Sequence, residues 1–434
     1  SNLPLIKYLV NLEANVTACD RRTKDDLGEN YKDLEKIGVK FNLGEKYLDN
    51  LSGDIIFKTP GMRYDVPELI RAKENGSRVT SEMEVFFDVC PSHIIAVTGS
   101  DGKTTTTTLI HKMMTGAGYK TWLGGNIGNP LLTDTEKMTE NDWVILELSS
   151  FQLHTMRKSP EIAVITNISP NHLDMHKDYQ EYIDAKKNIM LYQNESNVLV
   201  VNADNEVTAK IGEEAKGIVR YFSRQHNADI YLDGNIIKCE NDEVLNINDI
   251  KIPGMHNVEN YMTAIAAVKG LVDKDVIVEV AKTFTGVEHR IEHVRTFEGV
   301  KYYNSSIDSS PNRTINTLRV FPEKVIMIGG GKDKGIPYDE IGPALVEHVK
   351  VLILIGATSD KIKEALDKEI EKTGNGKDIE VIRVSSYEEA VNTARSKAND
   401  GDVVILSPAS TSFDMFRNFE ERGNLFKKIV NELK

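Results

Sequence analysis

The chain has 434 residues, enough for roughly three domains at about 150 residues each. Its 53 basic and 66 acidic side chains give a formal net charge of −13, which excludes a general basic surface for nucleic acid. Three scattered cysteines exclude a disulfide framework and a cysteine-rich zinc site, and no apolar stretch approaches the roughly 18 residues of a membrane helix. We therefore expect a cytoplasmic protein with no nucleic-acid and no membrane partner.

The predicted elements indicate an α/β fold of three domains. Residues 1–92 open with a helix and then a strand, which predicts a Rossmann-like domain whose first strand is missing. Residues 93–286 alternate strands with helices, so a central domain with a mostly parallel sheet is expected, ending in short hairpins. The pattern restarts in residues 287–434, as expected for a C-terminal Rossmann-like domain. In chain order, the predicted strands are 16–20, 54–59, 94–98, 143–148, 162–168, 197–202, 300–303, 324–328, 351–355, 380–384 and 403–406.

The strongest local signal is a glycine-containing run, Gly99-Ser100-Asp101-Gly102-Lys103-Thr104, between a predicted strand and a predicted helix. Glycines let backbone N–H groups approach phosphate oxygens closely, and the helix N-terminus adds favourable partial charge. Lys103 would then reach the outer phosphates, and the Thr104 hydroxyl would bind Mg²⁺. Because only two residues separate the glycines instead of four, an ordinary strand-to-helix turn remains the alternative.

Three further residues stand at the ends of predicted strands, and each has a plain structural alternative. Glu147 would point to the same sheet edge as the glycine run and bind a metal, or it is a solvated charge. His172 is a metal or phosphate ligand or an incidental loop histidine, and Leu173 excludes the zinc-protease pattern, which requires glutamate there. Asp20 either binds a ribose or is a turn or helix-cap acid.

A set of motifs resembles the Mur ligases, in the family's order and over essentially the whole chain. The motifs are Thr98–Thr104, Gly125-Asn-Ile-Gly128, Glu147-Leu-Ser-Ser-Phe-Gln-Leu153, Asn171-His-Leu-Asp174, His256-Asn-x-x-Asn260, His289-Arg290, Leu406-Ser-Pro-Ala409 and Asn418-Phe-Glu-x-Arg-Gly423. The resemblance implies an N-terminal domain for a UDP-sugar, a central P-loop ATPase domain and a C-terminal domain that admits an amino acid. The third motif and the last two motifs are typical of the family member that adds D-glutamate to UDP-N-acetylmuramoyl-L-alanine during peptidoglycan synthesis.

The reaction that this resemblance implies is ATP-dependent amide formation by a monomer. The substrate carboxylate attacks the γ-phosphoryl group of ATP, giving ADP and an acyl phosphate, and the D-glutamate amine then displaces phosphate. A carboxylate is a poor electrophile, so phosphorylation supplies its leaving group. The implied cofactors are ATP, two Mg²⁺ ions and a CO₂-derived carbamate on Lys186, for which a surface lysine in a Lys-Lys pair is the alternative.

The resemblance also implies roles for individual residues. Catalysis is assigned to Lys103, His172 and Lys186, and the metal ions to Thr104, Glu147, His172 and Lys186. The residues assigned to ATP are Gly99, Ser100, Asp101, Gly102, Lys103, Thr104, Thr105, Asn257, Asn260, Arg290 and Asp308. The UDP-sugar is assigned to Ser1, Asp20, Arg21, Gly61, Asn126, Ser150 and Gln152, and D-glutamate to Lys334, Ser412 and Phe419.

Some of these assignments have alternatives. Ser305 stands where the family commonly has a ribose-binding aspartate, so Asp308 either substitutes for it or caps the following turn. Lys334 is otherwise a solvated turn lysine, and Ser412 the N-cap of a helix over residues 413–429. For the whole chain, the rivals are another amide ligase such as a folylpolyglutamate synthase and a non-catalytic nucleotide-binding regulator. A dehydrogenase is the least favoured rival, because only the Rossmann-like pattern at the start of the chain supports it.

Overall fold

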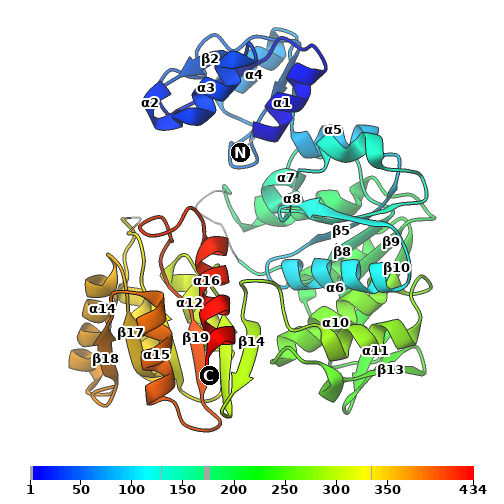
Figure 1. The fold of residues 1–434 in the computed structure, drawn as a ribbon. Coiled ribbons are helices and arrows are strands. Elements are labelled where there is room, and N and C mark those ends of the chain that lie inside the picture. Colours follow the sequence, from blue (N-terminus) through cyan, green and yellow to red (C-terminus); the bar gives the residue numbers. More distant parts are fainter. Residues whose placement is uncertain (1–2, 129, 171–175, 334) are drawn as a thin grey trace. The chain divides into compact units, whose positions relative to one another are not determined.

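The computed structural model describes residues 3–128, 130–170, 176–333 and 335–434, and its contacts divide the chain into two compact units (Figure 1). Unit 1 comprises residues 1–249 and 256–281, and unit 2 comprises residues 250–255 and 282–434. A separate domain for residues 1–92 stays a prediction. Among the described helices, none combines the length and the apolar character that crossing a membrane requires.

The N-terminal part of unit 1 contains two short parallel ladders, in which β1 pairs with β2 and β3 pairs with β4. Strands β2 and β4 were not among the predicted elements, because each is only three or four residues long. The elements are α1 (Leu3–Asn11), β1 (Thr17–Asp20), α2 (Lys24–Leu27), α3 (Glu29–Lys36), β2 (Lys40–Leu43), β3 (Ile55–Phe57), α4 (Pro67–Glu74), β4 (Arg78–Thr80) and α5 (Glu82–Val89).

A nine-stranded sheet forms the centre of unit 1, with the strand order β13-β12-β11-β10-β9-β8-β5-β7-β6. Strands β5 to β11 are parallel and the hairpins of β11, β12 and β13 are antiparallel, which confirms the predicted mostly parallel sheet. The strands are β5 (His93–Thr98), β6 (Thr121–Gly125), β7 (Trp143–Glu147), β8 (Ile162–Ile165), β9 (Val198–Asn202), β10 (Ile218–Ser223), β11 (Ile230–Asp233), β12 (Ile236–Cys239) and β13 (Asp242–Asn246). The helices are α6 (Lys103–Gly116), η1 (Leu132–Lys137), α7 (Ser150–Leu153), α8 (Tyr179–Leu191), α9 (Glu206–Glu213), η2 (Ile247–Asp249), α10 (Met255–Val268) and α11 (Lys274–Thr283).

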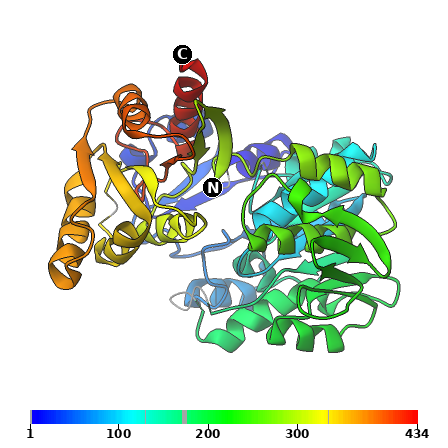
Figure 2. The same cartoon turned by 90° about the horizontal axis from the view of Figure 1, so that it is seen from below.

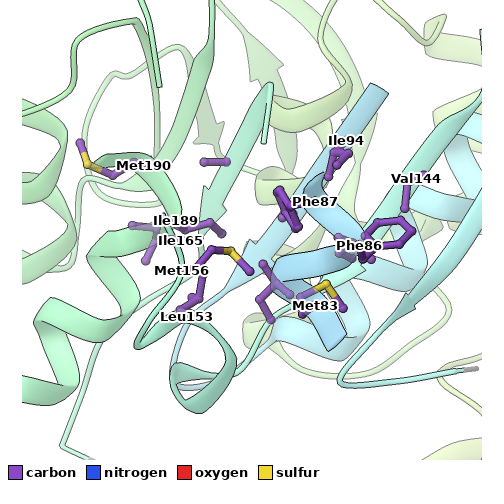
Figure 3. Packing of buried hydrophobic residues seen from close by; sticks show 14 of the residues in the cluster. Met83, Phe86, Phe87, Ile94, Val144, Leu153, Met156, Ile165, Ile189 and Met190 are labelled. Atoms are coloured by element: carbon purple, nitrogen blue, oxygen red, sulfur yellow. The ribbon is translucent and has the colours of Figure 1, made fainter. Parts of the chain in front are cut away.

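Helices cover the parallel sheet, so its strands are apolar nearly throughout. In β5, Ile94 and Ala96 belong to a core cluster with Phe86 of α5 and Ile189 of α8. Figure 3 shows part of this cluster, with Phe86 and Ile94 near Val144. A strand buried on both faces reads as a continuous apolar run rather than an alternating one, which is why these strands were predictable. The parallel strands therefore end together at one edge, which α6 and α7 follow.

Unit 2 is a six-stranded sheet of order β14-β15-β19-β16-β17-β18, in which only β14 is antiparallel to its neighbour. Two core clusters cover its faces: one includes residues of α12, α13 and α14, the other residues of α15 and α16, as Figures 1 and 2 show. Together with unit 1, this confirms the predicted α/β class. The elements are β14 (Glu292–Phe297), β15 (Val300–Asn304), α12 (Pro311–Leu318), β16 (Val325–Gly329), η3 (Asp339–Ile341), α13 (Gly342–His348), β17 (Val349–Leu354), α14 (Ser359–Thr373), β18 (Glu380–Arg383), α15 (Tyr387–Lys397), β19 (Val403–Leu406) and α16 (Phe419–Glu432).

The last helix begins later than one alternative from the sequence required. Helix α16 starts at Phe419, and its N-cap is Asn418, whose side chain accepts a hydrogen bond from the Glu421 N–H at 2.8 Å. Ser412 lies in a preceding turn, in which its carbonyl accepts hydrogen bonds from the N–H groups of residues 415 and 416. The alternative that Ser412 caps a helix over residues 413–429 is therefore wrong, because the asparagine supplies the cap.

Candidate active site

The glycine-containing run lies between β5 and α6, as predicted. Gly99 and Gly102 have φ angles of 149° and 77°, and Gly102 is the N-cap position of α6. A Cβ on Gly102 would lie 2.3 Å from Oδ1 of Asn260, so no side chain fits there without a shift. Lys103, Thr104 and Thr105 form the first turn of α6, with N–H groups that have no partner inside the helix. The loop therefore has the backbone that an anion site at a helix N-terminus needs.

Helix α10 brings two more predicted residues to this loop. The Asn260 Oδ1 atom accepts a hydrogen bond from the Thr106 hydroxyl at 3.3 Å. Its Nδ2 atom donates to Oδ1 of Asn257 at 3.0 Å, and both asparagines are buried. The sequence resemblance placed Asn257 and Asn260 at ATP, and the structure brings them against the start of α6.

Two lysine side chains meet at one carbonyl of the loop. The Lys103 ammonium donates to the Gly99 and Ser100 carbonyls at 3.0 and 2.9 Å, and Lys186 of α8 donates to the same Gly99 carbonyl at 2.7 Å. Lys186 is only 1% exposed, which removes the alternative of a surface lysine. Burial, followed by the charge of Lys103, lowers the pKa of Lys186 well below its usual value, although Glu147 acts in the opposite direction.

A buried carboxylate ends the neighbouring strand. Glu147 is paired with Val97 across β7 and β5 and is 2% exposed, so it is not the solvated charge of the alternative. Its Oε1 atom accepts a hydrogen bond from Nδ2 of Asn126 at 2.7 Å, whereas its buried Oε2 atom has no hydrogen-bond partner within the described part of the chain. An unsatisfied buried carboxylate oxygen is costly, and a cation at this position would satisfy it. The residues thus fit a divalent metal ion.

Sequence reasoning missed the residues that hold the loop in place. The Tyr182 hydroxyl lies 3.1 Å from the Ser100 hydroxyl, and the Lys186 ammonium lies 4.7 Å from the centre of the Tyr182 ring. Asn167, after β8, accepts a hydrogen bond from the Asp101 N–H at 3.0 Å. The spacing of Tyr182 and Lys186, which lie four residues apart on helix α8, could have indicated their contact with each other. Nothing in the sequence pattern marks Asn167.

The residues assigned to the UDP-sugar have varied surroundings. Asp20 accepts hydrogen bonds from Arg22, which lowers the pKa of Asp20 and favours the turn alternative. The Gln152 side chain forms a capping box with Ser149 at the start of α7. The Ser150 hydroxyl lies 3.0 Å from Nε2 of His176. Of the remaining residues, Arg21 is exposed, Gly61 lines a cavity with His176, Asn126 contacts Glu147 as described above, and Ser1 lies outside the described residues.

In unit 2, the predicted nucleotide residue Asp308 points into the protein. Its carboxylate is 3% exposed and accepts a hydrogen bond from the Ser407 hydroxyl at 2.8 Å, and burial raises its pKa. Helix α12 has Ser310 as its N-cap, so Asp308 does not cap that helix. Arg290 lies in the same unit, and its charge acts on the pKa of Asp308 in the opposite direction to burial. A contact of Asp308 with the nucleotide ribose stays a prediction.

The residues assigned to D-glutamate lie after β19 and at the start of α16. Ser412 is 3% exposed, and the Phe419 ring centre lies 5.9 Å from that of His289. The sequence motif contained Arg422 without giving it a role. Its fully buried guanidinium donates to the carbonyls of Ser306 and Ser410 at 2.8 and 3.0 Å, so it joins the loops that follow β15 and β19. Lys334 and His172 lie outside the residues that the structure describes.

Comparisons with known proteins match both units. Residues 97–268 match the family described as Mur ligase middle domain, and residues 289–410 match Mur ligase, glutamate ligase domain. The UDP-N-acetylmuramoylalanine--D-glutamate ligase of Ruminiclostridium cellulolyticum is 56% identical over 441 residues, covering 100% of this chain and 95% of that protein.

Two solved structures show the same fold at low identity. The UDP-N-acetylmuramate-alanine ligase of Thermotoga maritima has a TM-score of 0.60 and 18% identity, covering 99% of this chain and 96% of that one. The folylpolyglutamate synthase/dihydrofolate synthase of Yersinia pestis, complexed with AMPPNP and a Mn ion, has a TM-score of 0.55 and 16% identity, covering 80% and 92%. With the full-length relative, these matches confirm the resemblance seen in the motifs. The chain belongs to the Mur ligase family, among its UDP-N-acetylmuramoylalanine--D-glutamate ligases.

Proposed function

We propose that this protein joins D-glutamate to UDP-N-acetylmuramoyl-L-alanine at the expense of ATP, through an acyl phosphate, in a cytoplasmic step of peptidoglycan synthesis. The observation that carries the proposal is the meeting of Lys103, Lys186 and Glu147 at the phosphate loop, in a chain 56% identical over its length to a ligase of that name. We further propose that a monomer with three domains, residues 1–92, 93–286 and 287–434, performs the reaction.

The loop and Lys103 bind and orient the triphosphate. The N–H groups at the start of α6 and the Lys103 ammonium face the charge that spreads over the transferring phosphoryl group. The substrate carboxylate forms a bond to the γ-phosphorus while the bond to the ADP oxygen breaks. The D-glutamate amine then attacks the acyl carbon, and phosphate leaves with one of the original carboxylate oxygens. Asn257 and Asn260 keep α10 against the loop and so define its shape.

Thr104, Glu147, His172 and a carbamate on Lys186 would hold Mg²⁺, whose positive charge would let a carboxylate approach a triphosphate. The unsatisfied Oε2 atom of Glu147 supports this choice of ligand. Asn126 holds the other oxygen of Glu147 and thereby orients the carboxylate. The Mn ion named with the Yersinia pestis synthase is consistent with a divalent metal in this fold.

The carbamate on Lys186 requires an uncharged amine. Its nitrogen attacks the carbon of CO₂, a C–N bond forms, and one proton is released to give a negatively charged carbamate. Burial beside Lys103 lowers the pKa of Lys186, which raises the fraction of the reactive amine at neutral pH. The resulting charge would also remove the repulsion between the two neighbouring lysines.

For the second substrate, we propose that Ser412, Phe419 and Lys334 bind D-glutamate.

Phosphate release across pairs of substrates tests the proposal. We expect release from ATP only when UDP-N-acetylmuramoyl-L-alanine and D-glutamate are both present, and loss of that release in Lys103→Ala. Release with a folate and L-glutamate would instead support a folylpolyglutamate synthase, which shares this fold. Nucleotide binding without release under any pair would support the non-catalytic regulator.

A further inference from the structure

A small cavity in unit 1 lies next to the loop that follows β3, and its described lining residues do not include those of the phosphate loop. It is bounded by Lys58, Gly61, Arg63, Phe151, His154 and His176, and we call it the Lys58 cavity. Lys58, Gly61 and Arg63 come from the N-terminal part of the unit, and the other three come from α7 and the segments around it. Four of the nine described residues that line the cavity, Lys58, Arg63, His154 and His176, carry or are able to carry positive charge, and none is acidic.

Lys58 is the unusual member of this group. It is 5% exposed, yet its ammonium makes no hydrogen bond or ion pair within the part of the chain that the structure describes. Lysine is almost never buried to this extent without a partner, because the charge loses its hydration. Burial lowers the pKa of Lys58, and the Glu84 carboxylate acts in the opposite direction without reaching it as an ion pair. An anion at the cavity would supply the missing partner.

The other charged groups near the cavity are already compensated. Arg63 donates to the carboxylates of Asp65 and Glu181 at 2.8 and 3.0 Å, and these bonds lower the pKa of each acid to about 2. Burial lowers the pKa of His154, which favours the neutral form of this histidine. Lys58 is thus the cation that the surrounding described residues leave without a counter-charge.

A metal ion is the competing occupant. Ligand atoms of His154, His176 and Glu181 all lie within 4.8 Å of one another, a set suited to a transition metal. However, Glu181 already accepts hydrogen bonds from Arg63 and from the Lys177 N–H, and Lys58 and Arg63 line the same cavity. The charge of Arg63 is balanced by Asp65 and Glu181, but the uncompensated charge of Lys58 opposes a further cation and favours an anion. The electrostatics therefore select an anion.

We propose that Lys58 binds an oxygen of the diphosphate of the nucleotide-sugar substrate. The inference rests on the proposed function, in which the substrate carries two anionic groups. Its carboxylate must lie at the phosphate loop in order to attack ATP, which leaves the diphosphate for a second cationic site. Gly61, assigned to the UDP-sugar by motif, lines the same cavity, and Ser150 of that set lies 3.0 Å from His176. Lys58 is then a substrate-binding residue and takes no part in the chemical step.

The test compares Lys58→Met with Lys73→Met, a matched change of an exposed lysine on α4 of the same unit. Calorimetric titration with UDP and with UDP-N-acetylmuramoyl-L-alanine should show both ligands weakened by Lys58→Met by the same factor, about 10- to 150-fold for a lost charge-assisted contact. The KM for ATP should not change. Lys73→Met should bind both ligands like the wild type. Because the methionine removes an uncompensated buried charge, the melting temperature of Lys58→Met should equal or exceed that of the wild type.

Several results would overturn the inference. Equal affinity of the wild type and Lys58→Met for UDP would exclude a diphosphate contact. Weakened binding of the full substrate with unchanged UDP binding would place the substrate carboxylate at Lys58 instead. Stoichiometric Zn²⁺ binding by the wild type that His154→Ala removes would identify the cavity as a metal site. If the wild type binds neither nucleotide ligand, the proposed function itself fails, and this outcome is distinct from failure of the Lys58 variant alone.

Discussion

Burial changes the chemistry of Lys186, a residue proposed for the reaction. An exposed lysine is charged at neutral pH and does not attack CO₂, whereas the buried Lys186 beside Lys103 has a strongly lowered pKa. Its neighbour Lys187 is part of the same Lys-Lys pair but forms an ion pair with Glu214 at the surface. Two adjacent lysines of helix α8 therefore differ, since Lys186 is suited to act as a reactive amine and Lys187 forms an ordinary surface ion pair.

We predict that Lys186→Ala loses at least 99% of ligase activity, since the variant cannot form the carbamate proposed to hold the metal ions. A short carboxylic acid such as acetate should restore part of this activity, because it places a carboxylate in the space that the side chain left. Phosphate-release assays with and without acetate provide the measurement. Lys187→Ala is the control and should keep its activity. Full activity of Lys186→Ala without acetate would refute the role of the carbamate.

At the scale of an element, the start of helix α6 depends on glycine for two separate reasons. Gly102 has a positive φ, which L side chains rarely adopt, and a Cβ there would collide with Asn260 of α10. Gly118, just past the end of the same helix, also has a positive φ of 90° but has open space around it. A substitution at Gly118 therefore tests backbone strain alone, whereas a substitution at Gly102 tests backbone strain together with a steric contact.

We predict that Gly102→Ala raises the KM for ATP at least tenfold, because Asn260 and the loop must move apart. Gly118→Ala should cost about 1–2 kcal/mol of stability through its left-handed backbone and leave the KM for ATP unchanged. Steady-state kinetics and urea unfolding of both variants give the comparison. Should Gly102→Ala and Gly118→Ala have the same kinetics, the contact between the loop and α10 would have no part in nucleotide binding.

Helix α8 is also joined to the loop after β3 through an ion pair. Hydrogen bonds from Arg63 lower the pKa of Glu181 from 4.5 to about 2. A carboxyl group whose pKa is lower in the folded protein stabilises the fold above its unfolded value, near pH 4.5, and this stabilisation is lost as the pH falls towards 2. Acid therefore weakens the ion pair between helix α8 and the loop after β3.

We predict that Glu181→Gln lowers the unfolding free energy of unit 1 by about 1–3 kcal/mol at pH 7. The difference from the wild type should shrink as the pH falls from 4.5 towards 2. Fluorescence of Trp122 and Trp143, both in unit 1, reports urea unfolding at each pH. Glu206→Gln, which removes an exposed pair with Lys210, should have little effect at any pH. A Glu181→Gln difference that does not depend on pH would contradict the lowered pKa.

For the molecule as a whole, the sequence predicted the loop after β5 and most strands of the two large sheets, but not β6, β10 or β14. Strands such as β7 are buried on both faces, so their apolar runs are long enough to recognise. The strands β2 and β4 were missed because they have only four and three residues, too few for a recognisable pattern. Contacts between residues far apart in the sequence, such as the Tyr182 hydroxyl with that of Ser100 and the Arg422 guanidinium with the Ser410 carbonyl, have no local pattern and needed the structure.

The two units divide the proposed chemistry between them. Unit 1 contains the phosphate loop, Glu147 and Lys186, and the residues proposed for D-glutamate lie in unit 2. Activation of the carboxylate and capture by the amine are therefore assigned to different parts of the chain. The acyl phosphate is the species that links the two steps, and its formation is the central claim.

Transfer of ¹⁸O tests that claim most directly. UDP-N-acetylmuramoyl-L-alanine labelled with ¹⁸O in both oxygens of its alanyl carboxylate is turned over with ATP and D-glutamate, and the released phosphate is analysed by mass spectrometry. An acyl phosphate predicts one ¹⁸O atom in each phosphate and one retained in the new amide. Unlabelled phosphate, with ADP formed at the same rate, would show that water rather than the substrate carboxylate attacks ATP, and would contradict the proposed reaction.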